Sequence, residues 1–112
     1  MTYEEVAAMA EETGFPVAYD HFAEGDSPSP PFLLFLFPRS DDFRADGKAY
    51  KKISGLHFEL YTDRKQPDAE EAVEDVLDAH GMVYEKTEVW IPEEGLYEVL
   101  YSMEVLIDAK QQ

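Results

Sequence analysis

The sequence predicts an α+β fold in which two helices pack on one face of a mostly antiparallel five-stranded sheet, in the order α-β-β-β-α-β-β. Residues 69–80 place apolar side chains at helical intervals, and residues 96–106 alternate with a period of two. Short apolar segments between turn residues predict the remaining strands. The 112 residues have the length of one domain, expected over residues 1–107 with a frayed tail at 108–112.

The N-terminal segment predicts a helix over residues 2–13. Thr2 and Glu5 have the spacing of a capping box, in which each side chain binds the other residue's backbone N–H. Apolar residues then recur every three or four positions until Gly14 ends the pattern.

The next three segments predict a strand, a loop and a buried strand. Residues 17–22 alternate in the manner of a short strand. Residues 24–31 contain three prolines and no aliphatic side chain, so we expect an exposed loop. Residues 32–37 (FLLFLF) are apolar at every position and too few for a helix, which predicts a strand buried on both faces.

The centre of the chain predicts a polar loop followed by a long strand. Residues 39–48 are polar, and Asp46-Gly47 is a turn signal. Residues 49–61 read as a strand, and the change in apolar alternation near Gly55 predicts a β-bulge there.

Residues 67–80 carry the clearest helical pattern. Pro67 suits a first turn, Asp68 and Glu71 have capping-box spacing, and the apolar repeat stops at Gly81. The face opposite the apolar stripe is predicted to be exposed and acidic through Glu70, Glu71, Glu74, Asp75 and Asp78.

The C-terminal third predicts a β-hairpin. Residues 84–91 and 96–107 read as strands, and the four residues between them have the length of a hairpin turn. Apolar and polar residues alternate along the second strand, which is typical of an antiparallel strand with one buried face.

The net charge is -16, with 25 acidic and nine basic residues, and it is unevenly distributed. Residues 1–38 carry -7, residues 39–65 carry +2, and residues 66–112 carry -11. This balance excludes a simple nucleic-acid or anionic-membrane binder, because both need clustered Lys and Arg. The N-terminus is acidic and no apolar run could span a membrane, so we expect a cytosolic protein.

Catalytic and metal-binding motifs are absent from the sequence. The chain has no Cys, which excludes disulfides and thiolate chemistry, and His21, His57 and His80 are widely spaced. The acidic residues around Gly47 miss the spacing of a calcium loop, and no phosphate-binding or nucleophile-elbow motif occurs. We therefore expect no enzyme activity and no cofactor. The proline-rich stretch lacks the basic neighbour of an SH3 ligand.

Aromatic residues exceed what a small core needs. Tyr and Trp side chains whose polar group reaches solvent are frequent at protein interfaces, so the surplus indicates that the sheet contacts a partner. The residues in question are Phe32, Phe35, Phe37, Phe43, Tyr50, Phe58, Tyr61, Tyr84, Trp90, Tyr97 and Tyr101.

Several segments together resemble a known family. They are residues 17–22 (VAYDHF), Glu24-Gly25, 30–32 (PPF), 36–38 (LFP), Ala45-Asp46 with Tyr50, 59–65 (ELYTDRK) and 84–88 (YEKTE). The chain resembles small proteins encoded in the head-tail assembly module of tailed phages and prophages of Gram-positive bacteria. The resemblance implies a tail-terminator or tail-completion protein. It implies as partners a ring of its own copies and other head-tail or tail-tube proteins, first in the host bacterial cytoplasm and then in the virion.

The split charge predicts which residues form such a subunit contact. The basic residues are expected to line one side of the contact, because they flank a loop and not a core strand. Charge reversal at Arg44 and Lys48 is expected to weaken assembly without loss of fold. The predicted interface residues are Arg39, Phe43, Arg44, Lys48, Lys51, Lys52, Glu70, Glu74 and Asp78.

Two other functions stay open from the sequence. The charge of -16 on a small domain also fits an acidic inhibitor or nucleic-acid mimic that binds a basic host protein. A hydrolase using carboxylates or the scattered histidines is the remaining alternative.

Overall fold

The computed structural model describes the backbone of residues 1–38, 40–45 and 48–108, and the side chains of residues 1–38 and 53–108. It confirms an α+β fold with a mixed, mostly antiparallel sheet. The elements are α1 (Tyr3–Glu11), β1 (Val17–Tyr19), β2 (Phe32–Leu36), β3 (Ser40–Ala45), β4 (Lys48–Thr62), α2 (Pro67–Ala79), β5 (Tyr84–Ile91) and β6 (Leu96–Asp108).

The predicted five strands form one path in the order β1-β2-β4-β6-β5, and β3 is a sixth strand that pairs with β4 outside this path. Only β1 and β2 are parallel, and the other neighbours are antiparallel. Strand β4 is therefore the hub, since it pairs with β2, β3 and β6.

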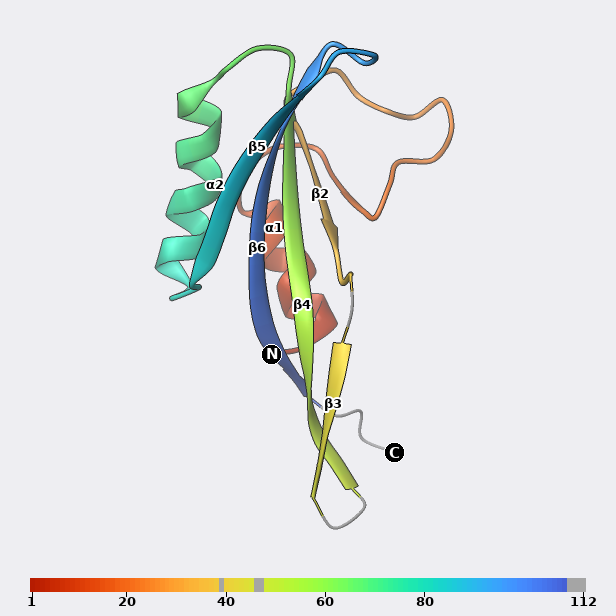
Figure 1. Ribbon diagram of the computed structural model, residues 1–112, viewed down its shortest axis with the longest axis vertical. Helices are drawn as coiled ribbons and strands as arrows, with labels where there is room; N and C mark the ends of the chain where they lie inside the picture. The colour runs from red at the N-terminus through yellow and green to blue at the C-terminus, as the bar shows by residue number, and fades with distance from the viewer. Residues whose placement is uncertain (39, 46–47, 109–112) are drawn as a thin grey trace.

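Both helices cover the same face of the sheet, and the core lies between the two layers (Figure 1). Phe58 on β4 lies opposite Tyr101 on β6, and both are fully buried. Alternate residues of these strands continue the buried face, and α1 and α2 add Val6 and Val73 to it. Every second residue of β6 from Val99 to Ile107 is therefore buried, as the alternation predicted.

Helix α1 begins with the predicted capping box. The backbone N–H of Glu5 donates to Thr2 Oγ1 over 3.1 Å, and the N–H of Thr2 donates to Glu5 Oε1 over 2.8 Å. The helix ends at Glu11, shortly before Gly14 turns the chain with a φ of 86°.

The N-terminus of α2 differs from the predicted capping box at Asp68. The N-cap is Gln66, its side chain makes no capping hydrogen bond, and Pro67 occupies the first helical turn as expected. Pro67 has no N–H to satisfy, which makes it suitable at this position.

Three strand predictions are corrected by the structure. Strand β1 ends at Tyr19 because Asp20 takes a left-handed φ of 68°, so residues 20–22 are not strand. No bulge occurs at Gly55, where the β4–β6 register continues unbroken, and the irregularity lies between Phe43 and Arg44. Asp108 belongs to β6 and not to a frayed tail, because its N–H donates to the Met1 carbonyl. Residues 109–112 lie outside the described part of the chain.

The predicted polar loop at residues 39–48 is largely strand. Residues 40–45 pair with residues 48–54 of β4, and the resulting β3–β4 hairpin extends beyond both helices (Figure 1). Strand β6 reaches along β4 only as far as Lys51. The end of the hairpin is therefore a two-stranded ribbon in the described part of the chain.

Candidate functional site

No helix in the described part of the chain covers the second face of the sheet, which we call the open face. The loop at residues 21–27 lies over one end of it, where Phe22 meets Phe32 edge-on at 5.4 Å. The rest of this face is half-buried or exposed. Its side chains are Leu34, Leu36, Ile53, His57, Glu59, Tyr61, Glu85, Thr87, Val89, Glu98, Leu100, Ser102, Glu104 and Leu106.

A hollow of about 490 Å³ lies in the open face where Gly55 supplies no side chain. Pro38 and His57 border it on one side, and Glu85 and Glu104 border it from β5 and β6. Gly55 pairs with Glu104 across the strands. The glycine that seemed to mark a bulge therefore opens a depression in a regular sheet.

Tyr61 and two carboxylates form a polar cluster farther along the open face. The single proton of the Tyr61 hydroxyl is within hydrogen-bonding reach of two acceptors, Glu59 Oε1 at 3.0 Å and Glu98 Oε2 at 3.3 Å from the hydroxyl oxygen. Burial raises the pKa of Glu59, and the nearby charges of Glu98 and Asp20 raise it further against the hydrogen bond from Tyr61. The ionised form of Glu59 is thus disfavoured in the folded protein.

Replacing Glu59 by Gln is expected to stabilise the protein at pH 7 by roughly 0.2–1 kcal/mol, because it removes repulsion between like charges on one sheet face. A carboxyl group whose pKa is raised in the folded state lowers the free energy of unfolding as the pH rises, because the unfolded state loses its proton more readily. Below about pH 4 the carboxyl is protonated in both states, so the stability gained by Glu59→Gln should vanish there. Urea denaturation of Glu59→Gln and the wild type at both pH values measures this. A variant less stable than the wild type at pH 7 would contradict it.

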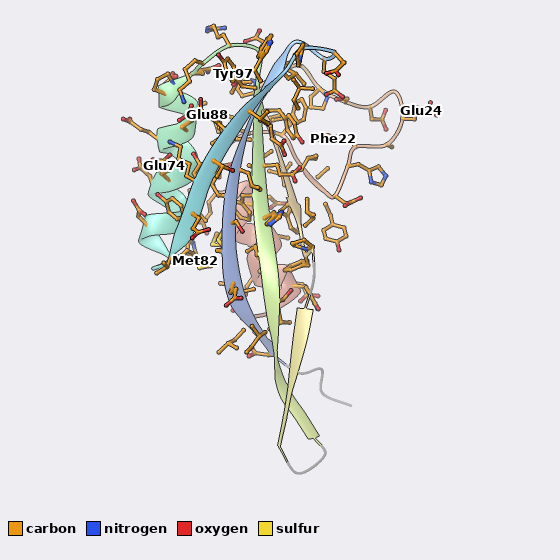
Figure 2. All side chains as sticks on the ribbon, in the orientation of Figure 1. Phe22, Glu24, Glu74, Met82, Glu88 and Tyr97 are labelled. Atoms are coloured by element: carbon orange, nitrogen blue, oxygen red, sulfur yellow. The ribbon has the colours of Figure 1, made fainter. Side chains whose placement is uncertain are left out.

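The side of α2 that faces β5 carries an ion-pair network. Lys86 Nζ lies 2.8 Å from Glu70 Oε1 and 2.7 Å from Glu74 Oε2. Lys65 Nζ binds the other oxygen of Glu70 over 2.7 Å and Glu88 over 2.6 Å. Glu74 and Glu88 are labelled in Figure 2, on either side of the contact between α2 and β5.

This network corrects the predicted acidic face of α2. Glu70 is only 4% exposed, so it does not belong to the solvent side of the helix. Glu74 accepts a hydrogen bond from the buried Tyr101 hydroxyl over 2.8 Å. Of the three carboxylates in the predicted interface, Glu70 and Glu74 are therefore engaged within the chain, whereas Asp78 is exposed. The ionic partners of Glu70 lie five and 16 positions away, which no helical spacing indicates.

A second, apolar hollow of about 440 Å³ lies beside α1 at the β1 edge. Tyr3 and Phe37 meet edge-on at 5.0 Å, and Tyr19 lies 5.3 Å from Phe35. Tyr3 and Tyr19 remain 46% and 57% exposed. The aromatic surplus seen in the sequence thus reaches the surface at this edge, as well as at Trp90, which is 44% exposed.

The predicted basic interface residues lie on or beside the β3–β4 hairpin. Their side chains lie outside the described ones, and Arg39 lies outside the described backbone as well. The backbone places Phe43 and Arg44 in β3 and Lys48, Lys51 and Lys52 in β4. Phe43, Arg44 and Lys48 were expected in a polar loop and lie on strands instead, whereas Lys51 and Lys52 lie on the strand predicted for them.

The three histidines stay apart. His21 lies 3.0 Å from Asp20, His80 lies 3.0 Å from Glu12, and His57 borders the hollow in the open face. Among the described residues, no three His, Asp or Glu side chains gather closely enough to hold a metal ion. Within that same part of the chain, neither helix is long and apolar enough to cross a membrane.

Comparison of the chain with protein-family models and with curated proteins finds no match.

Proposed function

We propose that this protein is a structural component of phage assembly, a tail-terminator, tail-completion or head-tail connector protein that acts through protein contacts. The observation that carries the proposal is the pair of unused binding surfaces: a projecting β3–β4 hairpin and an open sheet face (Figure 1). The hairpin is not needed for folding alone, because a bare two-stranded ribbon adds little stability.

The segments that resemble the phage family support this proposal by their place in the fold. Residues 17–19 form β1, residues 59–62 end β4, and residues 84–88 begin β5. Part of the resemblance therefore lies in the sheet and its two outer strands. Its implied partners are further copies of this chain and other head-tail or tail-tube proteins, met in the host bacterial cytoplasm and retained in the virion.

Deletion of the gene from the phage or prophage that encodes it tests this function. We expect electron micrographs of induced lysates to show heads and tails that are not joined, or tails of irregular length. Expression of the wild-type chain from a plasmid should restore complete particles. Normal infectious particles in the absence of the protein would overturn the proposal.

The outer side of α2 favours one alternative, an acidic inhibitor or nucleic-acid mimic. Glu71, Asp75 and Asp78 are exposed on a helix that contains no basic residue. Such a row of carboxylates can imitate phosphates toward a basic protein. Competition with DNA for a basic host nuclease would support this function, and the absence of any competition would exclude it.

A further inference from the structure

The charges of the body and of the hairpin are opposite in sign. The body, residues 1–38 and 53–108, holds 22 acidic residues and three basic ones. The segment at residues 39–52, which contains the hairpin, holds five basic residues and three acidic ones. The body is therefore strongly negative, and the segment that contains the hairpin has a small positive net charge.

All three basic residues of the body are already ion-paired within it. Lys65 and Lys86 bind the carboxylates around Glu70, and Arg64 lies 3.2 Å from its neighbour Asp63. The charged side chains of the body that can bind a partner are therefore mainly acidic, because its three cations are paired with its own carboxylates. The other six basic residues of the sequence belong to the hairpin segment or, in the case of Lys110, to the C-terminus.

The open face provides an acidic and partly apolar receiving surface. Glu85 and Glu104 are exposed at the rim of the hollow, and neither side chain makes an ion pair or hydrogen bond with any described residue. Leu106 and Val89 on the same face are 49% and 51% exposed. Such a surface suits a basic segment that also carries apolar groups, because Lys and Arg stems pack on apolar surface while their charges meet carboxylates.

From these observations we infer that the β3–β4 hairpin of one copy docks on the open face of a second copy, over the hollow between Glu85 and Glu104. This inference rests on the proposed assembly function and names its contact surfaces. The contact is head-to-tail, because hairpin and hollow are different surfaces of the chain, so each copy can bind one neighbour on each side. Docking also adds packing to the end of the hairpin, which pairs as two strands in the described part of the chain.

Charge reversal on each surface tests the contact. One variant carries Arg44→Glu with Lys48→Glu, and the other carries Glu85→Lys with Glu104→Lys. Sedimentation velocity at increasing protein concentration and low salt should show self-association of the wild type. The self-association constant of each variant alone should be lower than that of the wild type by a factor of about ten or more, because each variant places like charges opposite one another. An equimolar mixture of the two variants should associate again, because each then offers the opposite charge to the other.

A matched control separates this contact from the effect of net charge. Glu71→Lys with Asp75→Lys, on the exposed side of α2, changes the charge by the same amount as the open-face variant and should leave association at the wild-type level. Circular dichroism of every variant checks the fold, and association of the mixture shows that both are competent to bind.

Two results would overturn the inference. They are a wild type that stays monomeric at the highest concentration, and a mixture that associates no better than its separate variants. If the wild type associates and neither reversal matters, the surfaces are wrong and the proposed function stands. If the reversals behave as expected while gene deletion leaves particles normal, the contact stands and the proposed function fails.

Discussion

Replacing Phe58 by Ala is expected to lower the free energy of unfolding by about 3–5 kcal/mol, the usual cost of removing a buried aromatic ring. Phe58 is fully buried in β4, opposite Phe35 on β2 and Tyr101 on β6. Its ring therefore fills the space between three strands and the helices above them. A cavity at this point cannot close by small shifts, because residues from both layers border it.

The neighbouring residue provides the control for this prediction. His57 precedes Phe58 and lies on the open face, where it borders the hollow. His57→Ala should change the free energy of unfolding by no more than about 0.5 kcal/mol, as surface substitutions usually do. Urea denaturation of both variants measures the difference. Equal losses would show that the two faces of β4 are assigned wrongly.

Replacing Glu70 by Gln is expected to lower the free energy of unfolding at pH 7 by about 1–3 kcal/mol, the range for lost hydrogen bonds to a charged group. Burial alone would raise the pKa of Glu70, but hydrogen bonds from Lys65 and Lys86 outweigh it and hold that pKa below its ordinary value. The ionised carboxylate therefore stabilises the folded state.

The pH dependence follows from the direction of this shift. A carboxyl group whose pKa is lowered by folding contributes its full stabilisation at pH values above its unfolded-state pKa of about 4.3. This stabilisation is lost as the pH falls through the folded-state pKa. The difference between Glu70→Gln and the wild type should therefore shrink in acid. Glu71→Gln, one residue along and exposed, is the matched control and should be neutral. Chemical denaturation from pH 7 to pH 3 measures this, and a difference that grows in acid would contradict it.

Hydrophobic periodicity correctly predicted the elements that bury one regular face against the rest of the protein. The alternation along β6 holds because the odd-numbered residues from Val99 to Ile107 all face the helices. The helical repeat of α2 holds because Ala69, Val73 and Leu77 form one buried stripe. Both signals are local and need no knowledge of the partner element.

The features that sequence reasoning missed depend on residues distant in the chain. Strand β3 is polar, so its pairing with β4 left no apolar alternation to recognise. The polar Ser54 is buried and the apolar Ile53 lies on the open face, a reversal that imitated a bulge at Gly55. Glu70 is buried because Lys86 reaches it from β5. The hollow in the open face likewise forms from three strands at once.

The central pairing of β4 with β6 also has a consequence for the order in which the chain folds. Its partners lie between 35 and 57 positions apart, from Thr62 with Tyr97 to Lys51 with Asp108. The hairpin of β5 and β6 can close early because its strands are adjacent in the sequence, but the middle of the sheet must wait for a long loop to close. Such non-local topologies fold in milliseconds to seconds, so we expect the β4–β6 pairing to set the folding rate.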